Sequence, residues 1–147
     1  MKTVFNTVRS ALSGREPIFL TTEKTVREAA VILSDHGIGA APVLDGDQLV
    51  GIFTERDILR RVVAAGRDAD AMPVAEAMTP DPRTVSAETS LVNAFALMME
   101  GKFRHLPVVD GGGRVIAMLS IRDIPQEHQL MHLQWSVSRA RAPHKSA

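Results

Sequence analysis

Two short segments of the chain place a hydroxyl, an arginine and an aspartate at the same spacing. They are TERD at 54–57 and SIRD at 120–123. A hydroxyl at a helix N-terminus lies beside unpaired backbone N–H groups, and the helix dipole there favours a phosphate. The arginine can pair with phosphate oxygens, and the aspartate can accept hydrogen bonds from the adjacent hydroxyls of a ribose. The pattern thus predicts nucleotide contacts by Thr54, Arg56, Asp57, Ser120, Arg122 and Asp123.

The same spacing also suits a simple helix cap. Ser and Thr are preferred at the N-cap position, and an aspartate is favourable in the first turn. Thr25 and Glu28 form another such pair, so the chain uses caps elsewhere. However, a cap does not need the arginine that both segments carry. Taken alone, each segment is more typical of a helix cap, and the recurrence of the hydroxyl, arginine and aspartate in both segments keeps a nucleotide site in at least one of them as the alternative.

Both segments belong to a longer internal repeat. Pro42 in GAAPVLD and Pro107 in RHLPVVD are 65 residues apart, whereas Thr54 and Ser120 are 66 apart. One residue must be inserted between them, and we place it in the glycine run 111–113. The chain is therefore predicted to contain two copies of one unit of roughly 55–60 residues.

Each copy predicts a short strand, a helix, two strands and a second helix. Val26, Ala29 and Leu33 recur at helical spacing after Thr25, and Gly37 supplies a helix end. In the second copy, Pro125 falls early in the last helix, so we expect a kink or a restart there. The predicted class is α+β with an α/β-like pattern, in which each unit has a small three-stranded sheet and two helices. One such unit cannot bury its sheet alone, whereas two packed together can.

The organisation that follows has five parts. They are an N-terminal helix and linker at 1–16, the first unit at 17–71, a joining segment at 72–83, the core of the second unit at 84–125, and a C-terminal helix with a basic tail at 126–147.

This repeat resembles the cystathionine-β-synthase (CBS) domain, which occurs as a tandem pair called a Bateman module. The resemblance rests on TVREAAVILSDHGIGAAPVLDGDQLVGIFTERDI and SLVNAFALMMEGKFRHLPVVDGGGRVIAMLSIRDI, and it covers about residues 17–125. It implies pseudo-two-fold symmetry, adenine-nucleotide clefts between the units, and association into dimers. It also implies that the Ser or Thr contacts phosphate and that the Asp holds the ribose.

The resemblance places the adenine at the turn before the first core strand of each copy. The matching residues are Gly39, Ala40 and Ala41 in the first copy and Arg104, His105 and Leu106 in the second. Arg104 either contacts the ligand or is a solvated charge, and His105 is more typical of a structural residue. Thr84 matches a further contact position that Phe19 occupies in the first copy, so the two clefts are expected to differ.

The composition narrows the function. Seventeen basic residues balance seventeen acidic ones, which argues against a nucleic-acid or membrane binder, and cysteine is absent. No nucleophile, base and orienting group occur together, so we expect neither an enzyme nor a catalytic cofactor or metal.

We predict a cytoplasmic regulatory sensor of adenine nucleotides that forms a homodimer and acts on an effector protein in trans. AMP is the first candidate ligand, with ADP, ATP, NAD(H) and S-adenosylmethionine as alternatives. The competing hypothesis is a ligand-free scaffold.

Overall fold

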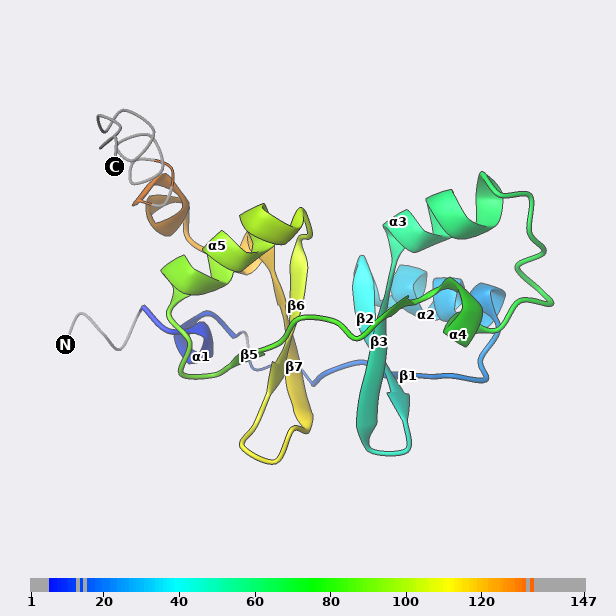
Figure 1. Cartoon of the computed structure of the whole chain (residues 1–147), viewed down its shortest axis with the longest axis horizontal. Helices are drawn as coiled ribbons and strands as arrows, with labels where there is room; N and C mark the ends of the chain where they lie inside the picture. The colour runs from blue at the N-terminus through cyan, green and yellow to red at the C-terminus, as the bar shows by residue number, and fades with distance from the viewer. Residues whose placement is uncertain (1–5, 13, 15, 132, 134–147) are drawn as a thin grey trace, which may run out of the picture.

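The computed structural model describes residues 6–12, 14, 16–131 and 133, and these form two units side by side (Figure 1). Each unit has its own sheet and its own hydrophobic core. No helix in these ranges is long and apolar enough to cross a bilayer. The two-unit α+β architecture confirms the predicted fold class.

The first unit contains a four-stranded sheet in the order β1-β2-β3-β4. β1 is parallel to β2, whereas β3 is antiparallel to both of its neighbours. Three strands were predicted, and the added β4 comes from the segment that joins the units. The elements are β1 (Leu20–Thr21), α2 (Val26–His36), β2 (Ala40–Asp45), β3 (Gln48–Thr54), α3 (Glu55–Asp57), the π-helix η2 (Ile58–Val63) and β4 (Thr79–Pro80).

The second unit repeats this plan with three strands in the order β5-β6-β7. β5 is parallel to β6, and β6 is antiparallel to β7. The glycine run 111–113 lies in the turn between β6 and β7, as predicted. The elements are β5 (Val85–Ser86), α5 (Leu91–Gly101), β6 (His105–Val109), β7 (Val115–Ser120) and the 3-10 helix η3 (Ile121–Asp123), and residues 126–131 are again helical.

The helix signals seen in the sequence act as expected in α2. The Thr25 hydroxyl accepts from Glu28 N at 3.1 Å, and the Glu28 carboxylate accepts from Thr25 N at 3.0 Å. Gly37 ends the helix in the left-handed conformation, at φ 63°. In α5, Ser90 caps Asn93 N, but Lys102 holds the left-handed position at φ 58°.

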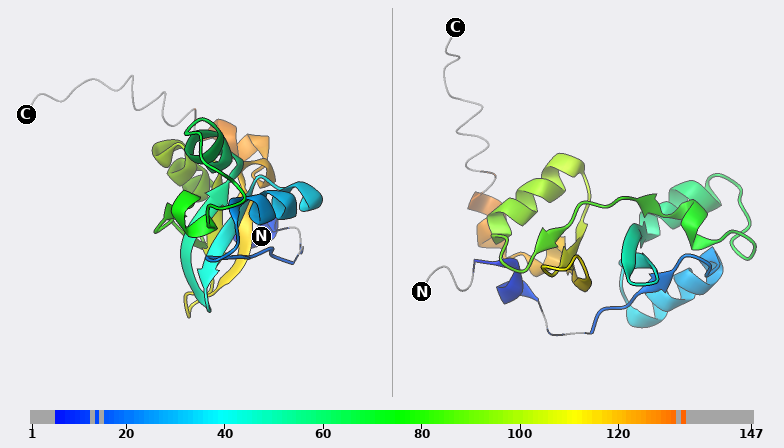
Figure 2. Two further views of the ribbon diagram at one scale, coloured as in Figure 1. Left: turned by 90° about the vertical axis from the view of Figure 1, so that its right-hand side faces the viewer. Right: turned by 60° about the horizontal axis from the view of Figure 1, so that its bottom comes forward.

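Two short helices each pack on a unit other than the one that they precede in sequence. α1 (Val8–Ala11) precedes the first unit, yet Val8 is fully buried in the core of the second. α4 (Val74–Ala77) follows the first unit and buries Val74 in its core, although the repeat aligns α4 with α1. Figure 1 and Figure 2 show α1 beside α5 and α4 in the other half of the molecule. We call α1 and α4 the exchanged helices.

Matching backbone hydrogen bonds hold the exchanged helices. For α1, Val8 N donates to Thr89 O at 2.8 Å, and Leu91 N donates to Asn6 O at 2.7 Å. For α4, Val74 N donates to Lys24 O at 2.7 Å, and Val26 N donates to Met72 O at 2.8 Å. The joining segment predicted at 72–83 therefore contributes Met72, Val74 and Ala77 to the core of the first unit and β4 to its sheet.

Pro125 interrupts the closing helix of the second unit, as predicted. η3 ends at Asp123, Ile124 after it is extended, and helical structure resumes only at 126–131. In the first unit, the corresponding helix runs from Glu55 to Val63 without a break, because no proline removes a backbone donor. This helix finishes as a π-helix.

Candidate functional site

In each unit, the two parts of the predicted site meet at one end of the sheet, where one core strand begins and the next one ends. We call this place the corner of the unit. Ala40 at the start of β2 pairs with Thr54 at the end of β3, and His105 pairs with Ser120 in the same way. Backbone hydrogen bonds fix these corners, since Glu55 N donates to Gly39 O at 2.9 Å. Each corner thus brings the hydroxyl–aspartate motif beside the segment predicted to contact adenine.

In the first corner, Asp57 is only 6% exposed and is hydrogen-bonded on both oxygens. Its Oδ2 accepts from Thr54 N at 3.0 Å and from Thr54 Oγ1 at 3.2 Å. Its Oδ1 accepts from Thr79 Oγ1 at 3.3 Å and lies 3.6 Å from Arg61 Nε. Thr54 Oγ1 in turn accepts from Asp57 N at 3.1 Å, which completes a capping box.

The second corner has the same box with fewer contacts. Asp123 Oδ2 accepts from Ser120 N at 2.8 Å, and Ser120 Oγ accepts from Arg122 N at 3.2 Å. Asp123 is partly exposed, and its Oδ1 has no hydrogen-bond partner among the described residues. Both motifs are therefore helix caps, but only the second leaves a carboxylate oxygen available.

The predicted arginines differ in what they contact. Arg56 Nη1 donates to Lys102 O at 3.2 Å, so it links the first unit to the second. The exposed side chains of Arg104 and Arg122 form no hydrogen bond or ion pair with any other residue that the structure describes. Arg104 lies at the second corner, where its carbonyl accepts from Ile121 N at 2.8 Å.

His105 is the residue where charges from both units converge. Burial lowers the pKa of His105, Glu55 of the first unit raises it, and Arg104 of the second unit lowers it. Asp123 raises the same pKa and Arg122 lowers it to a smaller extent. The pKa of this histidine therefore depends on groups from both units.

The other residues predicted to contact the nucleotide lie in different surroundings. Ala41 and Leu106 are fully buried in the two cores, and Ala40 is 3% exposed, so these three residues present almost no surface to a ligand in this conformation. Gly39 is partly exposed, with the Glu55 carboxylate close by: a Cβ at Gly39 would lie 3.1 Å from Glu55 Oε1. Thr84 is exposed and lines a pocket between the units.

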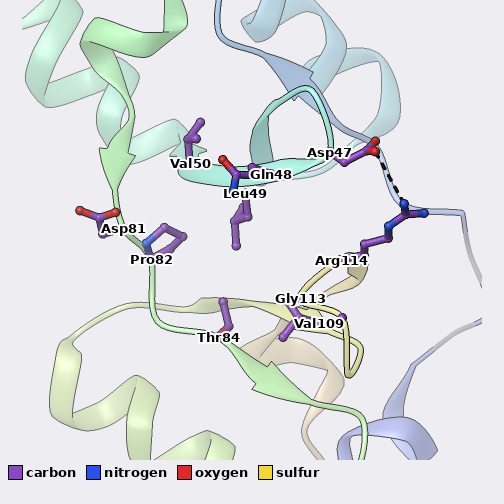
Figure 3. Close-up of a pocket in the computed structure, with 11 residues that line it drawn as sticks. Asp47, Gln48, Leu49, Val50, Asp81, Pro82, Thr84, Val109, Gly113 and Arg114 are labelled. Atoms are coloured by element: carbon purple, nitrogen blue, oxygen red, sulfur yellow. Dashed lines mark ion pairs between the residues drawn. The ribbon is translucent and has the colours of Figure 1, made fainter.

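This pocket is open, holds about 730 Å³ and receives residues from both hairpins (Figure 3). Its volume is within the usual range for small-molecule sites. Arg114 and Asp47 form an ion pair of 3.7 Å across it, between the turns of the two hairpins. Gln48 lies in its wall at the opposite end of β3 from Thr54, so the pocket extends away from the corners.

The sequence prediction missed three residues around the corners. Arg61 follows Asp57 by four positions, a helical spacing that could have identified it. Thr79 comes from the joining segment, and nothing in its sequence context indicates contact with Asp57. Glu55 lies inside the motif but was not predicted to face Gly39. In the described residues, no three metal-ligating side chains come together.

The family model for the CBS domain matches residues 8–64 and 74–126 of the chain. The chain belongs to the CBS domain family. The resemblance found in the sequence is thereby confirmed, and the matched ranges begin at the exchanged helices. The CBS pair is thus the whole of the two-unit body described above.

Curated relatives are similar over the pair. The mitochondrial CBS domain-containing protein CBSX3 of Arabidopsis thaliana is 38% identical over 112 residues, which cover 73% of this chain and 54% of that protein. The meiotically up-regulated gene 70 protein of Schizosaccharomyces pombe is 39% identical over 109 residues, which cover 74% of this chain and 15% of that protein. The chain therefore spans about half or less of these two relatives.

Solved structures share the fold. A CBS domain protein from Pyrobaculum aerophilum in complex with AMP is 29% identical, with a TM-score of 0.77 over 87% of this chain and 98% of that one. The CBS domain pair of protein MJ0100 in complex with 5′-methylthioadenosine and S-adenosyl-L-methionine is also 29% identical, with a TM-score of 0.74 over 82% and 98%.

Proposed function

We propose that this protein is a regulatory module that binds an adenosine-containing ligand between its two CBS units. The observation that carries the proposal is the pair of sheet corners, each with a hydroxyl–aspartate motif beside the segment predicted to contact adenine. The AMP, methylthioadenosine and S-adenosylmethionine complexes of structural relatives support the same class of ligand. AMP is the first candidate, and ADP, ATP, NAD(H) and S-adenosylmethionine are the alternatives.

The proposed mechanism is a shift in population between relative orientations of the units. The hydrogen bond from Arg56 to Lys102 O already connects the two units close to the corners, and Glu55 of the first unit raises the pKa of His105 in the second. A ligand that contacts both units would favour the orientation in which its contacts are best. An effector protein acting in trans would respond to that orientation, and we propose no catalysis by the chain itself.

We also propose that the module acts as a homodimer. Val31 on α2 and Leu59 and Val63 on η2 are 50%, 61% and 67% exposed, although all three are apolar. Apolar side chains that gather on one exposed face are typical of association surfaces, and Leu59 and Val63 are four positions apart on one helix. Analytical ultracentrifugation of the wild type and of Leu59→Asp tests this: a dimer that the substitution weakens supports the proposal, and a wild-type monomer at tens of micromolar rejects it.

A ligand-free scaffold remains the second candidate, because both hydroxyl–aspartate pairs are fully formed helix caps. Thermal unfolding with AMP, ADP, ATP, NAD⁺, NADH, S-adenosylmethionine and GMP separates the two functions. A one-site ligand at about 100 times its dissociation constant adds roughly 2.7 kcal/mol, which raises the midpoint by roughly 5–10 °C at this size. A rise with an adenine compound and none with GMP supports the sensor. No rise at millimolar concentrations, with protein shown to be free of nucleotide, supports the scaffold.

A further inference from the structure

The two aspartates of the repeated motif differ in their free hydrogen-bonding capacity. A carboxylate offers about four lone-pair positions. At Asp57, three hydrogen bonds and the Arg61 ion pair already use both oxygens, and the residue is 6% exposed. A ribose could bind there only by displacing internal donors. Among the described residues, the Asp123 carboxylate accepts one hydrogen bond, from Ser120 N to Oδ2. Its Oδ1 is therefore available to a ligand.

The donors on Asp57 belong to a cluster that holds the joining segment. Arg61 Nη1 donates to Met78 O at 2.8 Å, while Thr79 donates to Asp57 itself. Met78 also packs so closely against Gly51 that a Cβ at that position would displace the methionine side chain. Asp57 and Arg61 therefore fasten residues 78–79 to the first unit where β4 pairs with β3.

The second unit lacks the equivalent cluster in its sequence. Arg61 aligns with Glu127, which cannot donate to a carboxylate, and Gly51 aligns with Ala117. Thr79 aligns with Ser13, which lies outside the described residues. The break at Pro125 also separates Glu127 from the turn that carries Asp123.

The charges around the two corners also make the second corner the better site for an anionic ligand. At the first corner, the Glu55 carboxylate lies beside Gly39 and adds a negative charge close to Asp57. At the second, Ile121 takes the place of Glu55, and Arg104 and Arg122 present unpaired cations within the described part of the chain. The second corner therefore has cations free to meet an anionic ligand, whereas at the first corner Arg56 and Arg61 already donate within the protein and Glu55 adds a negative charge.

We infer that the chain binds one adenosine ligand, whose ribose hydroxyls donate to Asp123, and that Asp57 is instead a structural cross-link to the segment between the units. The first part of the inference, its ligand half, states that Asp123 binds the ribose, and this half alone rests on the proposed function. Its structural half, the cross-link, concerns the protein without ligand. The two motifs thus share a sequence and a cap but have separate roles.

Calorimetric titration of the full chain with AMP tests the ligand half, using the isosteric variants Asp57→Asn and Asp123→Asn. We expect about one AMP per chain in the wild type. Asp123→Asn should raise the dissociation constant at least about tenfold, since it removes a charged acceptor. Asp57→Asn should leave it within about threefold. Two AMP molecules per chain, or a loss of binding with Asp57→Asn alone, would overturn the inference.

Thermal unfolding without ligand tests the structural half. Asp57→Asn should lower the midpoint clearly more than Asp123→Asn does, and equal midpoints would reject the cross-link. If Asp57→Asn does not fold, Thr79→Val and Arg61→Gln each remove one donor, and they should lower the midpoint while AMP affinity stays within about threefold. If the wild type binds neither AMP nor any other compound of the panel, the proposed function fails, and the midpoints still decide the role of Asp57.

Discussion

The two CBS units share one backbone plan, but they differ at the few positions that decide chemistry. Their sheets pair in the same register and carry a bulge at the same place, after Val43 and after Val108. In contrast, both carboxylate oxygens of Asp57 accept hydrogen bonds from the protein, whereas Oδ1 of Asp123 accepts none from the residues that the structure describes. The comparison shows that the apolar pattern and turn residues preserve a repeated fold, while single polar positions can change independently in each copy.

The largest expected effect concerns the exchanged helices. Val8→Asp and Val74→Asp each place a charge where a side chain is fully buried, so each should lower the free energy of unfolding by about 3–5 kcal/mol. Hydrogen exchange should locate the loss for Val8→Asp in α5 of the second unit, and the loss for Val74→Asp in α2 of the first. Ala75→Asp, on the exposed face of α4, is the matched control and should change stability by less than about 0.5 kcal/mol. Loss of protection in the first unit for Val8→Asp would contradict the exchange.

Helix ends provide the second contrast, because the left-handed residue that follows α2 is Gly37, whereas the one that follows α5 is Lys102. Gly37→Ala should cost about 1 kcal/mol, since a side chain disfavours this conformation. Lys102→Gly should instead add about 0.5–1 kcal/mol, because it relieves that cost and keeps the carbonyl that accepts from Arg56. Urea unfolding measures both changes, and a destabilised Lys102→Gly variant would show that the lysine side chain contributes to the fold.

The N-caps of the same helices should differ by a smaller amount. Thr25 and Glu28 cap each other reciprocally, whereas Ser90 caps Asn93 in one direction only. We expect Thr25→Ala to cost about 1 kcal/mol and Ser90→Ala about 0.5 kcal/mol. The control is Glu28→Gln, which keeps a hydrogen-bonding side chain in the box. Equal losses for Thr25→Ala and Ser90→Ala would mean that reciprocity adds nothing measurable.

The smallest expected effect is a loss of stability just below neutral pH, to which His105 of the second unit contributes. Burial holds the pKa of His105 below its ordinary value of 6.5, and its counterpart in the first unit is Ala40. The unfolded chain therefore binds a proton more readily, so stability is complete above about pH 6.5 and falls as the pH drops below it. Unfolding measured from pH 7.5 to 5.5 should show this loss in the wild type and less of it in His105→Gln. Identical slopes would assign the loss to other groups.

The sequence predicted the parts of this molecule that depend on local pattern. The repeat, the strand pairs, the Thr25 box and the break at Pro125 all follow from spacing, capping and backbone chemistry, and the structure confirms them. The contact between Asp57 and Thr79 could not be predicted in this way, because it joins residues 22 positions apart across a turn of the tertiary fold. The exchange of α1 was missed for the same reason, since the apolar spacing of a short helix does not identify its partner.

The exchanged helices also determine the order in which the chain can fold. The hydrogen bond from Leu91 to Asn6 joins residues about 85 positions apart, and Val8 reaches its core only beside α5. At synthesis rates of 5–20 residues per second, α1 waits roughly 4–17 s for that partner to be made. The first unit completes earlier, because α4 follows it directly along the chain. Non-local closure of this kind raises contact order and slows folding, so we expect the second unit to be the last part of a nascent chain to become resistant to protease.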